Sequence, residues 1–110
     1  MKYVLILVIS FLIKEAQAKT ITVIATSYCA CKICCGSAAK GITATGVKVK
    51  VGIIAVDPKI IPFHSKVTID KKIYYAEDTG SAIKGKRIDI FMSTHEEAKK
   101  FGRKKLTVTF

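Results

Sequence analysis

The fold of this chain is decided by the stretch that reads Ala76-Glu77-Asp78-Thr79-Gly80-Ser81-Ala82-Ile83-Lys84-Gly85-Lys86-Arg87-Ile88-Asp89-Ile90-Phe91. Apolar and polar residues alternate at its two ends, as they do in β-strands with one buried face. The middle carries glycines and a serine at positions typical of turns. The stretch therefore predicts two strands, one ending near Glu77 and one beginning at Arg87, joined by a turn that Gly85 ends.

Further strand-like segments lie on both sides of this stretch. Short apolar or alternating runs bounded by turn residues are typical of small barrels and sandwiches. The chain is therefore predicted to be mainly β, with strands over 21–28, 51–56, 66–70, 73–77, 87–92 and 105–110 and one more near 42–44.

Two local signals add a hairpin and a helix. The polar residues Asp70-Lys71-Lys72 between two apolar runs predict a tight hairpin. The segment Ser93-Thr94-His95-Glu96 has the form of a capping box, Ala98 and Phe101 form an apolar stripe, and Gly102 follows as a stop signal. We expect this short helix to pack across one mouth of the barrel.

Three aspartates, Asp57, Asp78 and Asp89, each stand in a short apolar frame. A carboxyl group at the edge of a core loses hydration, which raises its pKa and lets it hold a proton near neutral pH. Such a group can act as a general acid. An aspartate before proline or before Thr-Gly is equally typical of a turn, where it accepts a backbone hydrogen bond, and this second interpretation applies to Asp57 and Asp78.

The residues beside Asp89 predict the direction of its side chain. If Ile88 and Ile90 face the core, Asp89 points to the opposite face of the strand. Partial burial and the other aspartates would raise its pKa there, whereas Lys84 and Arg87 would lower it. We expect the raised value, because a general acid must hold its proton.

The first 18 residues are interpreted as a secretory signal peptide. Lys2 precedes an apolar run over 3–13, and the segment ends in Ala16-Gln17-Ala18, which is typical of a cleavage site. The run is shorter than the roughly 20 apolar residues that span a bilayer, so no transmembrane anchor is expected after cleavage. Residues 19–110 are long enough for one domain. We expect a monomer that is secreted, periplasmic or bound to the cell wall.

The chain is strongly basic, with a formal net charge of +11. Such a charge draws a protein toward polyanions, which for a secreted protein are the anionic polymers of the cell envelope. The basic residues are scattered apart from a denser run over 99–105, and no nucleic-acid-binding motif accompanies them. We therefore expect no nucleic-acid partner, and most of this charge is interpreted as a solvated surface.

All four cysteines, Cys29, Cys31, Cys34 and Cys35, fall within seven residues. Export favours disulfides, and four thiols allow three pairings. A bond between the adjacent Cys34 and Cys35 would be strained, which leaves Cys29 paired with either of them and Cys31 with the other. Reduced thiols and a zinc site are the alternatives, although structural zinc sites normally take ligand pairs from separate segments. No metal or other cofactor is expected.

Several motifs agree in order and spacing with one known family. They are Ala55-Val56-Asp57-Pro58, Ile61-Pro62, Asp78-Thr79-Gly80, Ala82-Ile83-Lys84-Gly85, Ile88-Asp89-Ile90-Phe91 and Phe101-Gly102-Arg103. Through them the chain resembles the 3D domain, named for its three aspartates and related to the catalytic barrel of membrane-bound lytic transglycosylase A. Two positions depart from the usual pattern, because His64 stands where a glycine commonly precedes the serine and Ser81 replaces a second glycine after Asp-Thr-Gly.

This resemblance implies a six-stranded double-psi β-barrel that acts on the glycan strands of peptidoglycan. It further implies a lytic transglycosylase, which cleaves the β-1,4 bond between N-acetylmuramic acid and N-acetylglucosamine and forms a 1,6-anhydro sugar. Asp89 matches the acid/base position, with Asp57 and Asp78 as supporting groups. Secondary candidates for substrate contacts, each equally typical of ordinary loop chemistry, are Thr43, Thr79, Gly80 and Lys84.

Two other function classes stay open. Retention of all three aspartates favours the enzyme, whereas the small size and the absence of tryptophan weaken it, because a long glycan usually needs an extended groove. The second possibility is a binding module that holds glycan or another envelope polymer without cutting it. A small secreted toxin or inhibitor that works through its charge and its cysteine loop is the third possibility.

Overall fold

The structure, a computed structural model, describes residues 18–30 and 41–110. Residues 1–17, which make up nearly all of the predicted signal peptide, lie outside the described residues. So do Cys31, Cys34 and Cys35, and with them the predicted disulfides.

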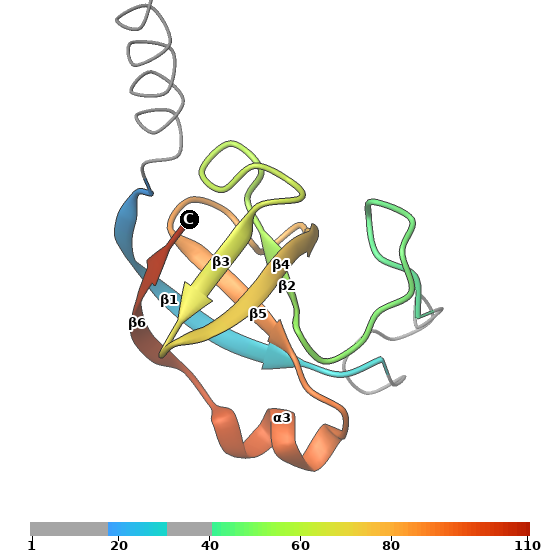
Figure 1. Cartoon of the computed structure of the whole chain (residues 1–110). Coiled ribbons are helices and arrows are strands. Elements are labelled where there is room, and N and C mark those ends of the chain that lie inside the picture. The colour runs from blue at the N-terminus through green and yellow to red at the C-terminus, as the bar shows by residue number, and fades with distance from the viewer. Residues whose placement is uncertain (1–17, 31–40) are drawn as a thin grey trace, which may run out of the picture.

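Six strands close into a barrel (Figure 1). They are β1 (Thr20–Tyr28), β2 (Ile53–Val56), β3 (Lys66–Ile69), β4 (Lys72–Asp78), β5 (Arg87–Phe91) and β6 (Lys104–Thr109). The order around the wall is β1-β5-β2-β4-β3-β6. The prediction of a mainly β, six-stranded barrel is confirmed, and each of these strands lies within two residues of its predicted bounds.

The barrel is mixed. β1 pairs in parallel with β5, and β2 pairs in parallel with β4, while the other neighbours are antiparallel. The predicted hairpin joins β3 to β4 through Asp70 and Lys71, whose φ angles are 49° and 65°. Positive φ at both central residues is the geometry of a two-residue type I′ turn, whose twist matches that of the strands.

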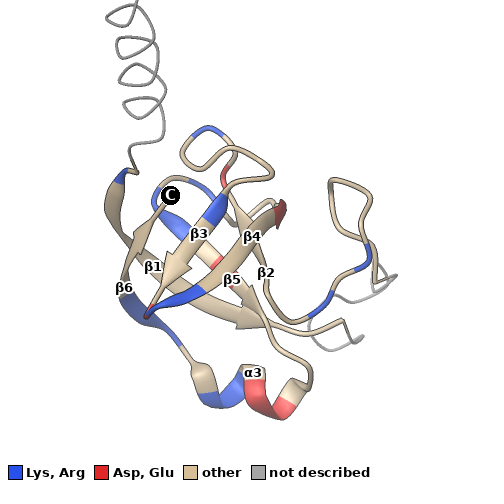
Figure 2. Ribbon diagram, viewed as in Figure 1, with Lys and Arg blue, Asp and Glu red and all other residues tan. Residues whose placement is uncertain are grey.

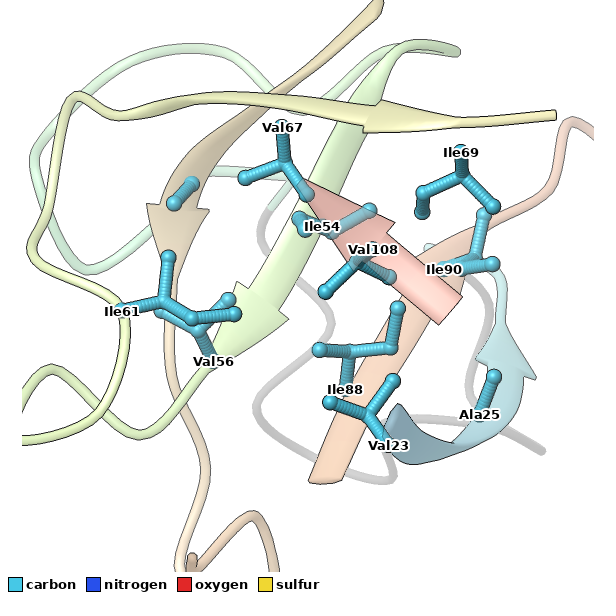
Figure 3. Close-up of a cluster of buried hydrophobic side chains, with 11 residues drawn as sticks. Val23, Ala25, Ile54, Val56, Ile61, Val67, Ile69, Ile88, Ile90 and Val108 are labelled. Atoms are coloured by element: carbon cyan, nitrogen blue, oxygen red, sulfur yellow. The ribbon is translucent and has the colours of Figure 1, made fainter. Parts of the chain in front are cut away.

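Alternate residues of the strands fill the interior of the barrel (Figure 3). The fully enclosed side chains include Val23, Ile54, Val56, Val67, Ile88 and Val108. Burying one such aliphatic side chain contributes about 1.5–3 kcal/mol, so this alternation fixes which face of each strand points outward. The outward face of β5 carries Asp89, as the sequence predicts.

One short helix, α3 (His95–Phe101), follows β5 at the end of the barrel where β1 and β5 finish (Figure 1). The predicted capping box, which begins at Ser93, is one residue too early. Thr94 is the N-cap, and its hydroxyl accepts from the Glu97 amide at 3.1 Å. The first turn is acidic and the last turn basic (Figure 2), which complements the helix dipole. Within residues 18–30 and 41–110, no helix has the length and apolar character needed to cross a bilayer.

The segment from Gly41 to Gly52 forms an arm beside β4. The strand expected near 42–44 is absent, and a single bridge joins Ile42 to Lys48. The turn within the arm is held to β4, because the Thr45 amide donates to the Glu77 carbonyl at 3.2 Å. Too few residues alternate here to build a regular ladder.

The backbone conformation of His64 shows why a glycine is usual at this position of the pattern. Its φ is 70°, a left-handed conformation that favours glycine. Its amide donates to the Ala76 carbonyl at 2.9 Å, and its ring Nδ1 lies 2.9 Å from Glu77 Oε1. The histidine therefore occupies a glycine-type backbone site and has an acidic partner that its loop position did not predict.

Candidate active site

Four residues form a row across four neighbouring strands. In the strand register Ala55 of β2 is opposite both Asp78 of β4 and Asp89 of β5. Asp89 in turn pairs with Thr26 of β1. The row therefore reads Asp78, Ala55, Asp89, Thr26 across the outer face of the barrel wall, and it brings together two of the three predicted aspartates from segments that are distant in sequence.

A β-bulge aims Asp78 at this row. Ile54 pairs with Ala76, but the next residue, Ala55, pairs with Asp78, so one residue of β4 is extra. Ala76 is fully buried, and strict alternation would therefore turn Asp78 inward as well. The bulge places Glu77 and Asp78 opposite one residue and re-aims the second side chain, so that both carboxylates lie on the outer face.

Three residues of the row, Asp78, Ala55 and Asp89, line an open cleft of about 170 Å³. Its lining residues are Tyr28, Ala55, Asp78, Thr79, Gly80, Ile83 and Asp89. Ala55 is 4% exposed, and its methyl group leaves the space between the two carboxyl groups unfilled. A larger side chain there would occupy the cleft.

Asp89 is half-buried, and loss of hydration raises the pKa of its carboxyl group. The Thr26 hydroxyl donates to Asp89 Oδ1 at 2.9 Å and opposes this shift, as does the charge of Arg87. The charge of Asp78 adds to the rise. The direction is the one expected from the sequence, and its main cause is desolvation.

Asp78 is held by three donors. The Tyr28 hydroxyl donates to Oδ2 at 3.0 Å, and the amides of Ala44 and Thr79 donate to Oδ1 at 3.0 and 2.9 Å. Tyr28 is itself fixed by an edge-to-face contact with Phe91, with ring centroids 5.5 Å apart. These contacts give the Asp78 side chain one orientation at the rim of the cleft.

Asp57 lies outside the cleft lining. Its Oδ2 accepts from the Gly85 amide at 2.8 Å and its Oδ1 from the Lys59 amide at 3.0 Å. These bonds, first the one from Gly85, lower the pKa of its carboxyl group. Asp57 thus holds the loop between β4 and β5 to the end of β2. These contacts agree with the interpretation of Asp57 as a turn residue that accepts backbone hydrogen bonds.

The structure divides the predicted substrate contacts in two. Thr79 and Gly80 line the cleft. Thr43 is buried inside the arm, where its hydroxyl accepts from the Val47 amide at 3.2 Å, and Lys84 is an exposed residue of the loop that Asp57 holds. Neither Thr43 nor Lys84 is part of the cleft lining.

Sequence reasoning missed Thr26 and Ala55 as parts of the site. Both roles depend on register between strands that lie far apart in the chain. The one local signal was Ala55 itself, a small residue between the large Ile54 and Val56.

Cys29 is buried beside α3, and its Sγ lies 3.8 Å from His95 Nδ1. The sequence did not predict a partner for this histidine. In the described part of the chain, no group of three or more His, Cys, Asp or Glu side chains is arranged to hold a metal ion.

A family model described as the 3D domain matches residues 52–110. This is more than half of the chain, and the chain therefore belongs to the 3D domain family.

Two relatives from Bacillus subtilis (strain 168) extend the similarity to the N-terminal part of the chain. YabE is 42% identical over 100 residues, which cover 86% of this chain and 23% of YabE. YocH, named a cell wall-binding protein, is 38% identical over 102 residues, which cover 86% of this chain and 33% of YocH. The chain thus spans a minor part of each relative.

Two solved structures share the barrel. The E. coli lytic transglycosylase MltA superposes with a TM-score of 0.52 at 21% identity, over 62% of this chain and 26% of that one. The lytic transglycosylase LtgG of Burkholderia pseudomallei gives a TM-score of 0.51 at 30% identity, over 63% and 26%. The likeness to MltA shows the fold alone.

Proposed function

We propose that the chain is a cell-wall lytic transglycosylase that cleaves the β-1,4 bond between N-acetylmuramic acid and N-acetylglucosamine in peptidoglycan. The observation that carries the proposal is Asp89, a half-buried carboxyl group with a raised pKa in an open cleft that it shares with Asp78. The barrel fold, which occurs in two lytic transglycosylases, supports it.

Asp89 acts first as acid and then as base. Thr26 donates to Oδ1, which leaves Oδ2 to carry the proton. That proton passes to the glycosidic oxygen while the bond from this oxygen to C1 of the muramic acid breaks. The Asp89 carboxylate then removes the proton of the C6 hydroxyl, whose oxygen bonds to C1. The product is 1,6-anhydro-N-acetylmuramic acid, and no water is consumed.

Asp78 is the supporting group in the cleft. Its charge helps Asp89 keep the proton that the first step needs. Because three donors fix it, it presents a preorganised negative charge to the positive charge that develops on the sugar in the transition state. Thr79 and Gly80 contact the sugar from the same wall, whereas Asp57 acts only by holding the adjoining loop.

Incubation of the purified chain with peptidoglycan sacculi tests the proposal. Mass spectrometry should detect released anhydro-muropeptides, and Asp89→Asn should lower their release by at least about 10²-fold. Asp70→Asn is the matched control, because Asp70 is exposed in the hairpin turn and asparagine tolerates its positive φ. Muropeptides with reducing ends would contradict the mechanism, since they arise by hydrolysis.

A second candidate is a module that binds cell wall glycan without cleaving it. The name of YocH, a cell wall-binding protein, favours it. Retention of the chain on sacculi without release of any muropeptide would support this function over the first.

A further inference from the structure

A second hollow, of about 470 Å³, lies on the outer face between the arm and β4. Its lining residues are Val47, Lys48, Lys50, Ile53, Tyr75 and Glu77. Neither the proposed cleavage nor the family motifs account for it, since most of these residues lie upstream of the matched motifs or on the outward positions of β4.

Exposed apolar side chains form part of the lining of this hollow. Among the described residues, the large hydrophobic side chains that are exposed all come from the arm and from β4, namely Ile42, Val47, Val51, Ile73 and Tyr75. Two of them, Val47 and Tyr75, line the hollow together, and exposed apolar surface within a hollow is typical of a binding site.

Neighbouring residues of β4 line the hollow and the cleft. Glu77 lines the hollow and its neighbour Asp78 lines the cleft, because the bulge turns both outward. The turn of the arm crosses β4 at this point, where the Thr45 hydroxyl donates to Glu77 Oε2 at 2.6 Å and the Ala44 amide to Asp78 Oδ1 at 3.0 Å. A branch on a sugar held in the cleft would reach the hollow by passing this turn.

The charges at the hollow favour an anion with apolar parts. Lys48 and Lys50 are two of its lining residues, and the arm that carries them projects to the side of the barrel (Figure 2). Glu77 is the opposing charge, but its two oxygens are engaged by Thr45 and His64, and the Thr45 bond above all lowers the pKa of its carboxyl group. Glu77 therefore stays ionised, but the two lysines of the lining outnumber it and leave the hollow with a net positive charge.

We propose that this hollow binds the peptide stem that peptidoglycan carries on alternate sugars. A stem peptide has small apolar side chains, which suit the floor of Ile53, Tyr75 and Val47, and free carboxylates, which suit Lys48 and Lys50. The inference rests on the proposed function, because it takes the sugar in the cleft to be the one that bears the stem.

Binding to a soluble disaccharide-peptide tests the inference. The probes are the compound with free stem carboxylates and the same compound with those carboxylates amidated, each titrated against the chain by calorimetry. Lys48→Ala/Lys50→Ala should weaken binding of the free acid about fivefold, the scale of exposed ion pairs, and amidation should have a similar effect. Lys99→Ala/Lys100→Ala, on exposed positions of α3, removes the same charge elsewhere and should change little.

Equal weakening by both double variants would overturn the inference, since it would show a non-specific charge effect. Equal affinity for acid and amide would overturn it as well. A cleavage assay on glycan strands without stem peptides distinguishes a failure of this inference from a failure of the proposed function. If the chain cleaves them but does not bind the stem peptide, the inference fails alone, and if it binds the stem peptide but releases no anhydro product from any glycan, the proposed function fails alone.

Discussion

Asp57 and Asp89 both stand in a short apolar frame, yet their surroundings shift the pKa values of their carboxyl groups in opposite directions. At the end of β2, Asp57 accepts two amide hydrogens, from Gly85 and Lys59, and the pKa of its carboxyl group falls. In the middle of β5, Asp89 has the Thr26 hydroxyl as its hydrogen-bond donor, and burial raises the pKa of its carboxyl group.

The difference comes from where the backbone donors are. Amides are free at the turn that follows a strand, so an aspartate there becomes a structural acceptor. Inside a strand the amides donate to the neighbouring strands, so they do not lower the pKa of an outward aspartate, which can then hold a proton for catalysis. Asp89, in the middle of its strand, is thus the general-acid candidate, and Asp57, just beyond the end of its strand, is a loop anchor.

Asp89→Asn is expected to have the largest effect. Loss of the acid should lower the rate of anhydro-muropeptide release by at least about 10²- to 10⁴-fold, while the fold stays intact because asparagine can still accept from Thr26. Product quantified by mass spectrometry, together with a circular dichroism spectrum, checks this. A variant that keeps full activity would remove Asp89 from the mechanism.

Ala55→Leu should come next, because it fills the space between Asp78 and Asp89 without touching either charge. We expect a loss of activity of about tenfold or more, with a modest cost in stability from overpacking, of about 1–3 kcal/mol. Ala55→Ser is the control, since it is nearly the same size. If the leucine variant folds and cleaves normally, the substrate does not use this cleft.

Local pattern was enough to predict the strands, the hairpin and the outward position of Asp89. Each of these depends on neighbours in sequence, such as Ile88 and Ile90 beside Asp89. The parallel pairing of β1 with β5, which brings Thr26 to Asp89, depends on contacts across the barrel. The bulge that re-aims Asp78 was likewise invisible, because strict alternation after Ala76 predicts the opposite face.

Asp57→Ala should act on stability rather than on chemistry. It leaves the amides of Gly85 and Lys59 without their acceptor, and we expect a melting temperature lower by several degrees, as for the loss of a loop-anchoring contact. Because the pKa of Asp57 is lowered from its ordinary 3.8, its stabilisation is present above that pH and disappears as the pH falls through the lower value. Thermal melts should therefore separate variant and parent at neutral pH and bring them together in acid. A gap that persists below the folded pKa would contradict this.

In the same thermal melts, Asp89→Asn should change the stability at neutral pH in the opposite direction to Asp57→Ala. The raised pKa of Asp89 means that the folded state favours the protonated form, so its contribution is complete below the ordinary value of 3.8 and is lost as the pH rises through the higher folded value. The asparagine variant should equal the parent in acid and be slightly more stable at neutral pH. A variant less stable at neutral pH would mean that the ionised carboxylate is a net stabiliser.

Thr26→Val gives the smallest expected change and the finest test of the site. The Thr26 hydroxyl donates to Asp89 Oδ1 and lowers the pKa of that carboxyl group, so its removal should raise the pKa further. The alkaline limb of the pH–activity profile should move upward, with a change in rate below about tenfold at neutral pH, because one hydrogen bond is at stake. Thr26→Ser keeps the hydroxyl and should restore the parent profile. A limb that stays in place in the valine variant, or moves downward, would show that another group titrates in the reaction, and the contrast between Asp57 and Asp89 would then describe stability alone.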